Sequence, residues 1–201
     1  SSGKSISCRK QKIEDIEESS EKIIGVRALI NQKQAFVSSS QVDRENLDKL
    51  VSKCVSMAKQ APDDDTAVLG DSEFFETNIS DLDLFQKDET DTQMLVDSVM
   101  ECEDAALSVE GITNSEGAGA SFSTGEFFLA TSNGFRGGYK SSGNSISCSV
   151  LAGEGQSMER DYETSSAIYF DDLPSPAIIG SKAAQQTLRR LNPKKVASCK
   201  V

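Results

Sequence analysis

The chain has 201 residues, of which 37% are hydrophobic and 26% charged, a mix typical of a folded domain with an apolar core. Its net charge of −11 would repel a phosphate backbone, which argues against a nucleic-acid partner. No apolar run approaches the roughly 20 residues that span a bilayer, so we expect no membrane insertion.

The first 60 residues predict two hairpins followed by a helix. Polar and apolar residues alternate through residues 4–38, with a turn at 31–33, as in antiparallel strands. Apolar residues then recur at helical spacing over 43–60, and Pro62 closes this segment. We expect one face of that helix to be buried against the strands.

An acidic middle section follows. Residues 61–110 hold sixteen acidic side chains and one basic side chain, Lys87, whereas the rest of the chain holds 20 basic and 16 acidic ones. We interpret residues 63–90 as a long connection fixed by Leu and Phe side chains. A helix over 91–107, capped by Thr90 or Thr92, is predicted to bury an apolar stripe and to expose an acidic outer face.

From residue 108 to 170 the sequence is rich in Gly, Ser and Thr, with short β-prone runs that predict an antiparallel meander. Ser132-Asn133-Gly134 favours a type I′ hairpin turn, since both Asn and Gly tolerate positive φ. A last helix is predicted over 177–191. The fold class is therefore α+β, mainly antiparallel sheet with two or three packed helices, and whether one sheet or two form stays open.

One octapeptide recurs. Residues 1–8 and 141–148 differ at one position in eight, which two equivalent strands would explain. Ser-rich strands also converge easily, and the residues flanking the two segments do not match, so a genuine repeat is not required.

Several chemistries are excluded by composition. The chain has no His, so it cannot by itself form a Ser-His-Asp triad, a Cys-His pair or an HExxH zinc site. Its five cysteines, Cys8, Cys54, Cys102, Cys148 and Cys199, are each more than forty residues apart and lack a CxxC pair. We therefore expect a reducing compartment and buried, apolar thiols rather than disulfides or a thiolate metal site.

Two segments could still support a site. Glu159, Asp161 and Glu163 share one face of a predicted strand, where they could bind cations or, more simply, pair with Arg or Lys. The Gly-rich segments 111–125 and 134–139 lack a phosphate-binding pattern. They mark either plain turns or bulges and close backbone approaches, which would suit a groove that accepts an extended peptide by strand addition.

Residues Val109-Glu110-Gly111-Ile112-Thr113-Asn114-Ser115-Glu116-Gly117-Ala118, and six segments that follow them in order, resemble the N-terminal half of the TldD/PmbA family, also called the modulator-of-DNA-gyrase family. The six segments are Ser132-Asn133-Gly134-Phe135, Gly138-Tyr139, Met158-Glu159-Arg160-Asp161-Tyr162, Leu173-Pro174-Ser175-Pro176, Ile179-Gly180 and Thr187-Leu188-Arg189-Arg190-Leu191-Asn192-Pro193-Lys194-Lys195. The third and the last are closer to the PmbA (TldE) branch. The resemblance is strong over 107–195 and weak upstream from Val26.

The resemblance implies a cytoplasmic bacterial protein that pairs with a TldD-type subunit in a zinc metalloprotease acting on small, unfolded peptides. The family zinc motif, HExxxH, belongs to the C-terminal half, so no metal ligand or catalytic residue maps onto this chain, and zinc is expected in a TldD-type partner. Residues 1–195 would form an N-terminal α+β domain, subdivided near 108, and 196–201 would begin a C-terminal domain. Dimerisation would go through the full-length protein.

Seven residues are therefore candidates for a substrate groove or a subunit interface: Asn114, Ser115, Glu116, Gly117, Tyr139, Arg160 and Asp161. The main hypothesis is a non-catalytic part of a PmbA/TldE-like subunit that helps to hold extended peptide. The alternative is an interaction or assembly module, whose acidic 61–110 segment docks a basic partner without touching substrate.

Overall fold

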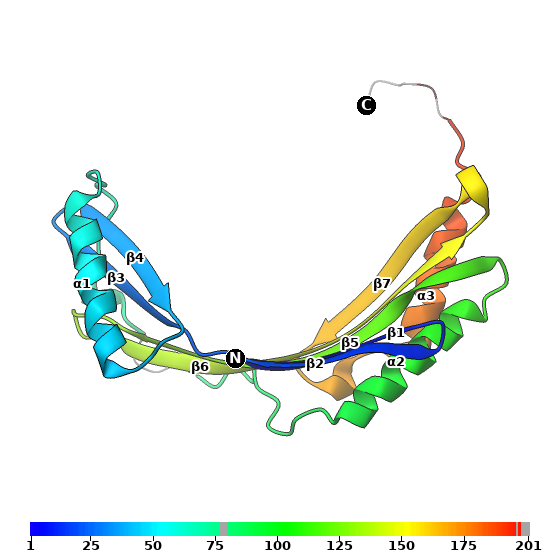
Figure 1. Cartoon of the computed structure of the whole chain (residues 1–201), viewed down its shortest axis with the longest axis horizontal. Helices are drawn as coiled ribbons and strands as arrows, with labels where there is room; N and C mark the ends of the chain where they lie inside the picture. The colour runs from blue at the N-terminus through cyan, green and yellow to red at the C-terminus, as the bar shows by residue number, and fades with distance from the viewer. Residues whose placement is uncertain (77–79, 196, 198–201) are drawn as a thin grey trace. The chain divides into compact units, whose positions relative to one another are not determined.

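The computed structural model describes residues 1–76, 80–195 and 197 (Figure 1). Its strands are β1 (Ser2–Arg9), β2 (Lys12–Ser20), β3 (Ile24–Ile30), β4 (Lys33–Ser39), β5 (Ile112–Ala130), β6 (Arg136–Ala152) and β7 (Glu159–Ala167). Its α-helices are α1 (Arg44–Gln60), α2 (Thr92–Leu107) and α3 (Pro176–Arg190), and 3-10 turns cover Ser72–Phe74, Gly155–Ser157 and Phe170–Asp172. The predicted α+β fold with antiparallel pairing is confirmed.

Contacts divide the chain into two compact units. The sheet unit comprises Ser2–Ser19, Asp83–Gly125 and Lys140–Val201, and the hairpin unit comprises Ser1, Ser20–Leu82 and Glu126–Tyr139. A five-stranded sheet, ordered β2-β1-β5-β6-β7, lies mainly in the sheet unit with α2 and α3. The two-stranded sheet β3-β4 lies in the hairpin unit with α1, so the described part of the chain forms two sheets.

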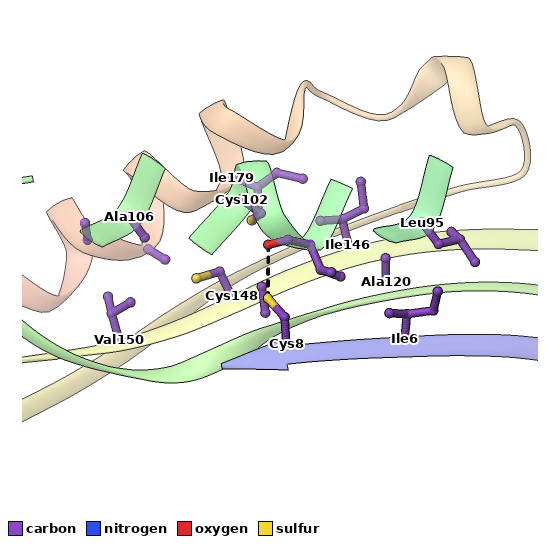
Figure 2. Packing of buried hydrophobic residues seen from close by; sticks show 14 of the residues in the cluster. Ile6, Cys8, Leu95, Cys102, Ala106, Ala120, Ile146, Cys148, Val150 and Ile179 are labelled. Atoms are coloured by element: carbon purple, nitrogen blue, oxygen red, sulfur yellow. Dashed lines mark hydrogen bonds between the residues drawn. The ribbon is translucent and has the colours of Figure 1, made fainter. Parts of the chain in front are cut away.

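One face of the five-stranded sheet is buried under α2 and α3 (Figure 2). Alternate residues of β1, β5 and β6 point into this core, where the predicted apolar stripe of α2 meets them. The core cluster consists of Ile6, Cys8, Leu95, Val99, Cys102, Ala106, Ala118, Ala120, Phe122, Ile146, Cys148, Val150, Ile179, Ala183 and Ala184. Four of the five cysteines are free and buried, as predicted, and Cys199 lies outside the described residues.

The two similar octapeptides are neighbours of the same strand. Ser5 of β1 lies opposite Ser121 of β5, and on the other side of β5 the Ser145 hydroxyl lies 2.9 Å from that of Ser121. The isoleucine that follows each of these serines is buried in the core. The two segments therefore occupy equivalent positions on the two sides of β5.

A carboxylate of α2 joins the helix to the sheet. Glu103 is fully buried, and it accepts hydrogen bonds from the backbone N–H groups of Lys10 (2.8 Å) and Gln11 (2.7 Å) in the β1–β2 turn. Both turn residues have positive φ, 52° and 57°, so they aim their N–H groups at one point. The predicted acidic outer face is present, since Asp97, Glu101 and Asp104 are exposed, and Glu103 is an additional acidic residue that faces inward.

Burial alone would raise the pKa of Glu103, but hydrogen bonds from the Ser115 hydroxyl and from the turn outweigh it and hold this pKa below its usual value of 4.5. A carboxyl whose pKa is lower in the folded chain stabilises the fold above its unfolded pKa, and this stabilisation is lost as the pH falls through the folded pKa.

Replacing the carboxylate by its neutral isostere should therefore cost stability in a pH-dependent way. We expect Glu103→Gln to lower the free energy of unfolding by about 2–3 kcal/mol at pH 7, because an amide offers one acceptor and places a donor against the N–H groups. Urea titrations at pH 7 and below pH 4 measure this. The difference between the variant and the parent chain should shrink at the acid pH, and a constant difference would contradict the linkage.

Helices α2 and α3 approach closely at a glycine. A Cβ at Gly180 would lie 1.9 Å from the carbonyl oxygen of Cys102, so no other residue fits without separating the helices. The buried Ala183 and Ala184 continue the small-residue contact along α3. These contacts pack α3 against α2, and the helix also packs against β7.

Gly180→Ala tests this contact. Helix propensity alone would make the substitution stabilising by about 1 kcal/mol, but the clash with the backbone of α2 should reverse the sign. We expect a net loss of about 1–3 kcal/mol in urea unfolding. Gln185→Ala, at an exposed position of the same helix, is the matched control and should change stability by less than about 0.5 kcal/mol.

In the hairpin unit, α1 packs on β3 and β4 as predicted. Asp43 caps the helix by accepting the N–H of Asn46 at 3.1 Å. Leu50, Cys54 and Ala58 form the buried face of this helix, and the Cys54 thiol donates a hydrogen bond to the carbonyl of Val26 at 3.2 Å. Val51, which belongs to the predicted stripe, is 46% exposed.

The connection over 63–90 is fixed by only some of the predicted Leu and Phe side chains. Phe74 and Leu82 are 80% and 67% exposed, so they do not anchor it, and residues 77–79 lie outside the described residues. Phe75 does act as predicted, since its ring packs edge-on against Phe135 with centroids 5.2 Å apart, and Leu84 and Phe85 are half-buried. Polar contacts also fix the segment. In the sheet unit the Gln86 N–H donates to the Ser142 hydroxyl at 2.8 Å. In the hairpin unit the Gln34 amide donates to Asp64 at 2.5 Å.

Two local assignments were also wrong. The turn at 132–134 is in the predicted place, but it is a longer loop in which the Thr131 N–H donates to the Phe135 carbonyl, and Gly134 alone of the predicted three has positive φ. Asp91, without a side-chain cap bond, precedes α2. Thr90 is instead buried and donates to Asn144, so a tertiary contact takes the hydroxyl that a cap would use.

Candidate functional site

β5 contains an extra residue near its start. Ser115 and Ala118 are both buried although they are three residues apart, so the alternation of the strand is interrupted between them, as at a β-bulge. Gly117 has φ +116°, and a Cβ there would lie 2.5 Å from the carbonyl oxygen of Cys8. The bulge therefore requires glycine, and it leaves Glu116 exposed.

An open hollow of about 340 Å³ lies beside this bulge. It is lined by Glu116, Gly117, Ser147, Cys148, Ser149, Arg160 and Tyr162. In β7, Arg160 and Tyr162 are exposed and alternate with more buried neighbours, and Tyr162 pairs with Ser149 of β6. The polar side chains of the hollow therefore lie on the sheet face opposite the two helices.

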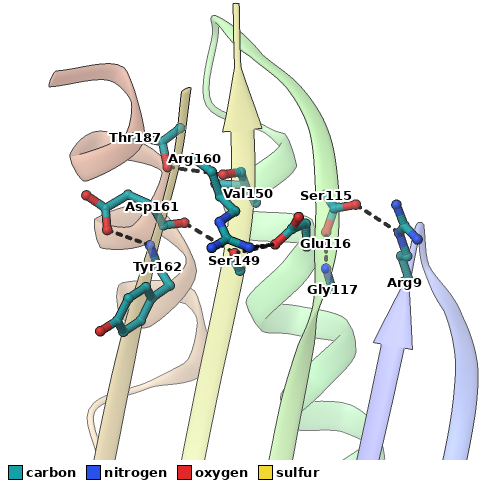
Figure 3. Close-up of polar contacts among 10 residues, drawn as sticks. All are labelled: Arg9, Ser115, Glu116, Gly117, Ser149, Val150, Arg160, Asp161, Tyr162 and Thr187. Atoms are coloured by element: carbon teal, nitrogen blue, oxygen red, sulfur yellow. Dashed lines mark hydrogen bonds and ion pairs between the residues drawn. The ribbon is translucent and has the colours of Figure 1, made fainter. Parts of the chain in front are cut away.

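An ion pair crosses the hollow (Figure 3). Nη1 of Arg160 lies 2.8 Å from Oε2 of Glu116, and the Ser149 hydroxyl lies 3.3 Å from the same oxygen. The side chains of the pair are 62% and 38% exposed, so the pair contributes at most about 1 kcal/mol to stability. Since it is held weakly, an incoming charged group can replace either partner.

The other candidates have different roles. The buried Ser115 accepts the N–H of Gly117 through its hydroxyl at 2.9 Å, and Asn114 Oδ1 accepts the N–H of Ser115 at 2.9 Å, so both shape the bulge. Tyr139 belongs to the hairpin unit, where its ring centroid lies 5.7 Å from that of Phe127. Of the seven candidates, Glu116, Gly117 and Arg160 meet at the hollow.

Asp161 lies on the other side of β7, in a row of half-buried carboxylates next to α3. It pairs with Arg190 at 3.3 Å, and Glu159 pairs with the same guanidinium at 3.6 Å. Glu163 accepts a hydrogen bond from the amide of Gln186. The carboxylate row predicted from the sequence is therefore present, and its contacts tie β7 to α3, as the interpretation of paired side chains requires.

Sequence reasoning missed Ser147, Ser149, Tyr162 and Arg9. The first three reach the hollow because of strand register, which no local motif encodes. Arg9 reaches the bulge from the end of β1, where its Nε donates to the Ser115 carbonyl at 3.0 Å. A second hollow of about 460 Å³ adjoins this arginine and is lined by Arg9, Lys10, Lys12, Ile13 and Glu14. The one sequence signal for Ser147, Ser149 and Tyr162 was the alternation of side chains between the two faces of β6 and β7.

Two of the buried thiols, those of Cys8 and Cys102, are not suited to nucleophilic chemistry. Burial raises the pKa of Cys8 to about 12, and a hydrogen bond with Cys148 together with burial raises that of Cys102. Both thiols stay protonated at neutral pH. Among residues 1–76, 80–195 and 197, no three His, Cys, Asp or Glu side chains converge as metal ligands, and no helix has the length and apolarity to cross a membrane.

Comparison with known families shows to which family this chain belongs. Residues 85–191 match the model of the PmbA/TldA metallopeptidase central domain, and residues 1–58 match PmbA/TldA metallopeptidase domain 1. The chain belongs to the PmbA/TldA metallopeptidase family. This confirms the resemblance to the N-terminal portion of PmbA-type proteins that the six ordered segments indicate.

Two curated family members align with almost the whole chain. The metalloprotease PmbA homolog of Haemophilus influenzae is 32% identical over 201 residues, 100% of this chain and 45% of that protein. Metalloprotease PmbA of Escherichia coli O157:H7 is 30% identical over 98% of this chain and 44% of that protein. The chain thus spans about 45% of the length of these relatives.

Solved structures of family members share the fold. A putative modulator of DNA gyrase from Bacteroides thetaiotaomicron superposes with a TM-score of 0.83 at 25% identity, covering 97% of this chain and 45% of that one. TldE from Thermococcus kodakarensis gives a TM-score of 0.73 at 13% identity, covering 93% and 42%. At the latter identity the likeness concerns the fold alone.

Gly117→Ala tests how much the close approach of the bulge to β1 contributes to stability. We expect a loss of about 2–4 kcal/mol in urea unfolding, because the substitution adds backbone strain and a clash with Cys8. Gly134→Ala is the matched control, since Gly134 has φ +104° but open space around it, and it should show the strain cost alone, about 1–2 kcal/mol. Equal losses at the two positions would mean that the close approach to β1 is unimportant.

Proposed function

We propose that this chain is the N-terminal, non-catalytic part of a PmbA/TldE-like subunit of a TldD-type zinc metalloprotease complex that processes small, unfolded peptides. Its role is to hold extended substrate while a TldD-type partner supplies the chemistry. The observation that carries the proposal is the open hollow beside the bulge, whose walls suit an extended peptide, in a metallopeptidase family member whose 201 residues contain no His for a zinc site.

The residues present do not fit a zinc ion. Peptidase zinc sites use His with Glu or Asp and leave one position open, and this sequence has no His. The metal that the relatives' names imply therefore belongs to another part of the assembly, and no hydrolytic step runs through the residues described above. We place the complex in the cytoplasm, and we assign residues 1–195 to an N-terminal domain and 196–201, of which only 197 is described, to the start of the next.

The hollow is the part of this chain that suits a peptide. It is open, it lies on a sheet face, and its wall combines an aromatic ring, hydroxyls and a weakly held ion pair. A volume of about 340 Å³ accommodates one or two residues, so longer peptides would extend beyond it along the sheet. An assembly module without substrate contact would not require this feature.

Photo-crosslinking distinguishes these two functions. With benzoylphenylalanine in place of Tyr162, the purified chain should crosslink a short unstructured peptide in a saturable manner. The same group in place of Phe74, which is 80% exposed in the hairpin unit, is the control and should not. Crosslinking at neither position would favour the assembly module.

The catalytic half of the proposal is tested in the same preparation. The chain alone should hydrolyse no peptide and bind no stoichiometric zinc. Hydrolysis by the chain alone that survives a chelator would refute the division of labour between this subunit and its partner.

A further inference from the structure

We propose that the hollow between Glu116 and Arg160 is a recognition site for a peptide carboxylate, with Arg160 as the binding residue. This inference rests on the proposed peptide-holding function and names the chemical group that the site selects. It concerns recognition alone and involves no covalent step.

The first argument is the position and exposure of the Arg160 guanidinium. Arg160 stands on an edge strand, at the wall of an open hollow, and its side chain is 62% exposed. Arginine binds carboxylates through two parallel N–H···O bonds, a geometry that a peptide terminus matches. Its present partner, Glu116, is itself a carboxylate, so the chain already shows which ligand this guanidinium accepts.

The second argument is the way in which Glu116 is placed. Only the bulge at Gly117 leaves this side chain exposed within reach of Arg160, and the bulge demands a glycine pressed against β1. Since an exposed ion pair adds little stability, the fold gains almost nothing from this arrangement. Glu116 acts as an internal stand-in that keeps Arg160 oriented, and it yields when a ligand carboxylate arrives.

The third argument is the local charge. Although the chain carries −11 overall, its acidic excess is concentrated in 61–110. The guanidinium of Arg9 also lies at the bulge, and the adjoining hollow contains Lys10 and Lys12 against one acid, Glu14. Arg9, Lys10, Lys12 and Arg160 thus balance Glu14, Glu103 and Glu116 at this end of the sheet, which lowers the repulsion that an incoming carboxylate meets.

A ligand carboxylate has further donors and a wall available. The hydroxyls of Ser147 and Ser149 line the same hollow, and the Tyr162 ring, 61% exposed, offers apolar area to the adjoining side chain. The carboxylate could be a peptide's C-terminus or an acidic side chain. The chemistry is shared, and the experiment separates the two sources.

The test titrates the 201-residue chain with three probes and follows the backbone amides of Gly117 and Tyr162 by NMR. The probes are acetyl-trialanine acid, its C-terminal amide, and acetyl-Ala-Glu-Ala amide. We expect the acid to bind roughly tenfold more tightly than the trialanine amide. Equal affinities would overturn the carboxylate site and leave peptide holding intact, whereas binding of none of the probes would overturn both. Comparable binding of the third probe supports a side-chain carboxylate as ligand, and weak binding supports the terminus.

Two substitutions with opposite expected effects on affinity exclude general damage to the fold as their cause. Arg160→Gln should abolish the preference for the acid, whereas Glu116→Gln, which removes the internal competitor, should tighten binding of the acid by roughly two- to five-fold. Arg190→Gln is the control, because this arginine pairs with Glu159 and Asp161 on the helix side, and it should leave affinity unchanged. Weaker binding in both hollow variants would contradict the proposal.

Discussion

The hydrogen bonds that Glu103 accepts inside the sheet unit hold the β1–β2 turn and the start of the bulge beside the hollow. This one carboxylate, on α2, receives the N–H groups of Lys10 and Gln11 from the β1–β2 turn and the hydroxyl of Ser115 from β5. It thus fixes the end of β1 and the start of the bulge relative to the same helix. Because an unsatisfied buried carboxylate is costly, the three elements can only assemble together.

The bulge transmits this constraint to the exposed face. Ser115 lies in the core with Glu103, and two residues later Gly117 is pressed against β1, so the residue between them has little freedom. Glu116 is exposed as a result, and Arg160 meets it from β7. A feature of the core therefore decides which charged groups face one another on the surface, and this couples the stability of the fold to the proposed recognition of peptides.

The elements that the sequence predicted well are those with a strong period or cap. The helices over 44–60, 92–107 and 176–190 lie within a residue or two of their predicted ranges, because apolar spacing and flanking polar or proline residues define them locally. The long strands were predicted as short pieces, since the Gly and Ser residues of β5 and β6 have low β-propensity and are strands only through pairing with neighbours. Glu103 could not be placed, because its partners in the β1–β2 turn are more than ninety residues away in the chain.

Only part of the candidate site was predicted, again because some of its residues are brought together by contacts between distant segments. Glu116, Gly117 and Arg160 came from motifs, whereas Ser149 and Tyr162 depend on how β6 and β7 pair. Asp161 is next to Arg160 in sequence, yet it faces α3, because neighbouring residues of a strand point to opposite faces. A motif thus identifies a segment, and the register of the sheet decides which of its side chains share a site.

β5, the central strand of the five, supplies only small side chains over residues 117–121, while the isoleucines at 6 and 146 on its two neighbours fill the core. The bulk of this layer is thus provided from the flanks, by two strands of nearly the same sequence. Enlarging Ala120 would need a compensating reduction at one isoleucine or the other, and either would serve. The side chains of this layer can therefore be substituted in two equivalent ways while the path of the backbone stays the same.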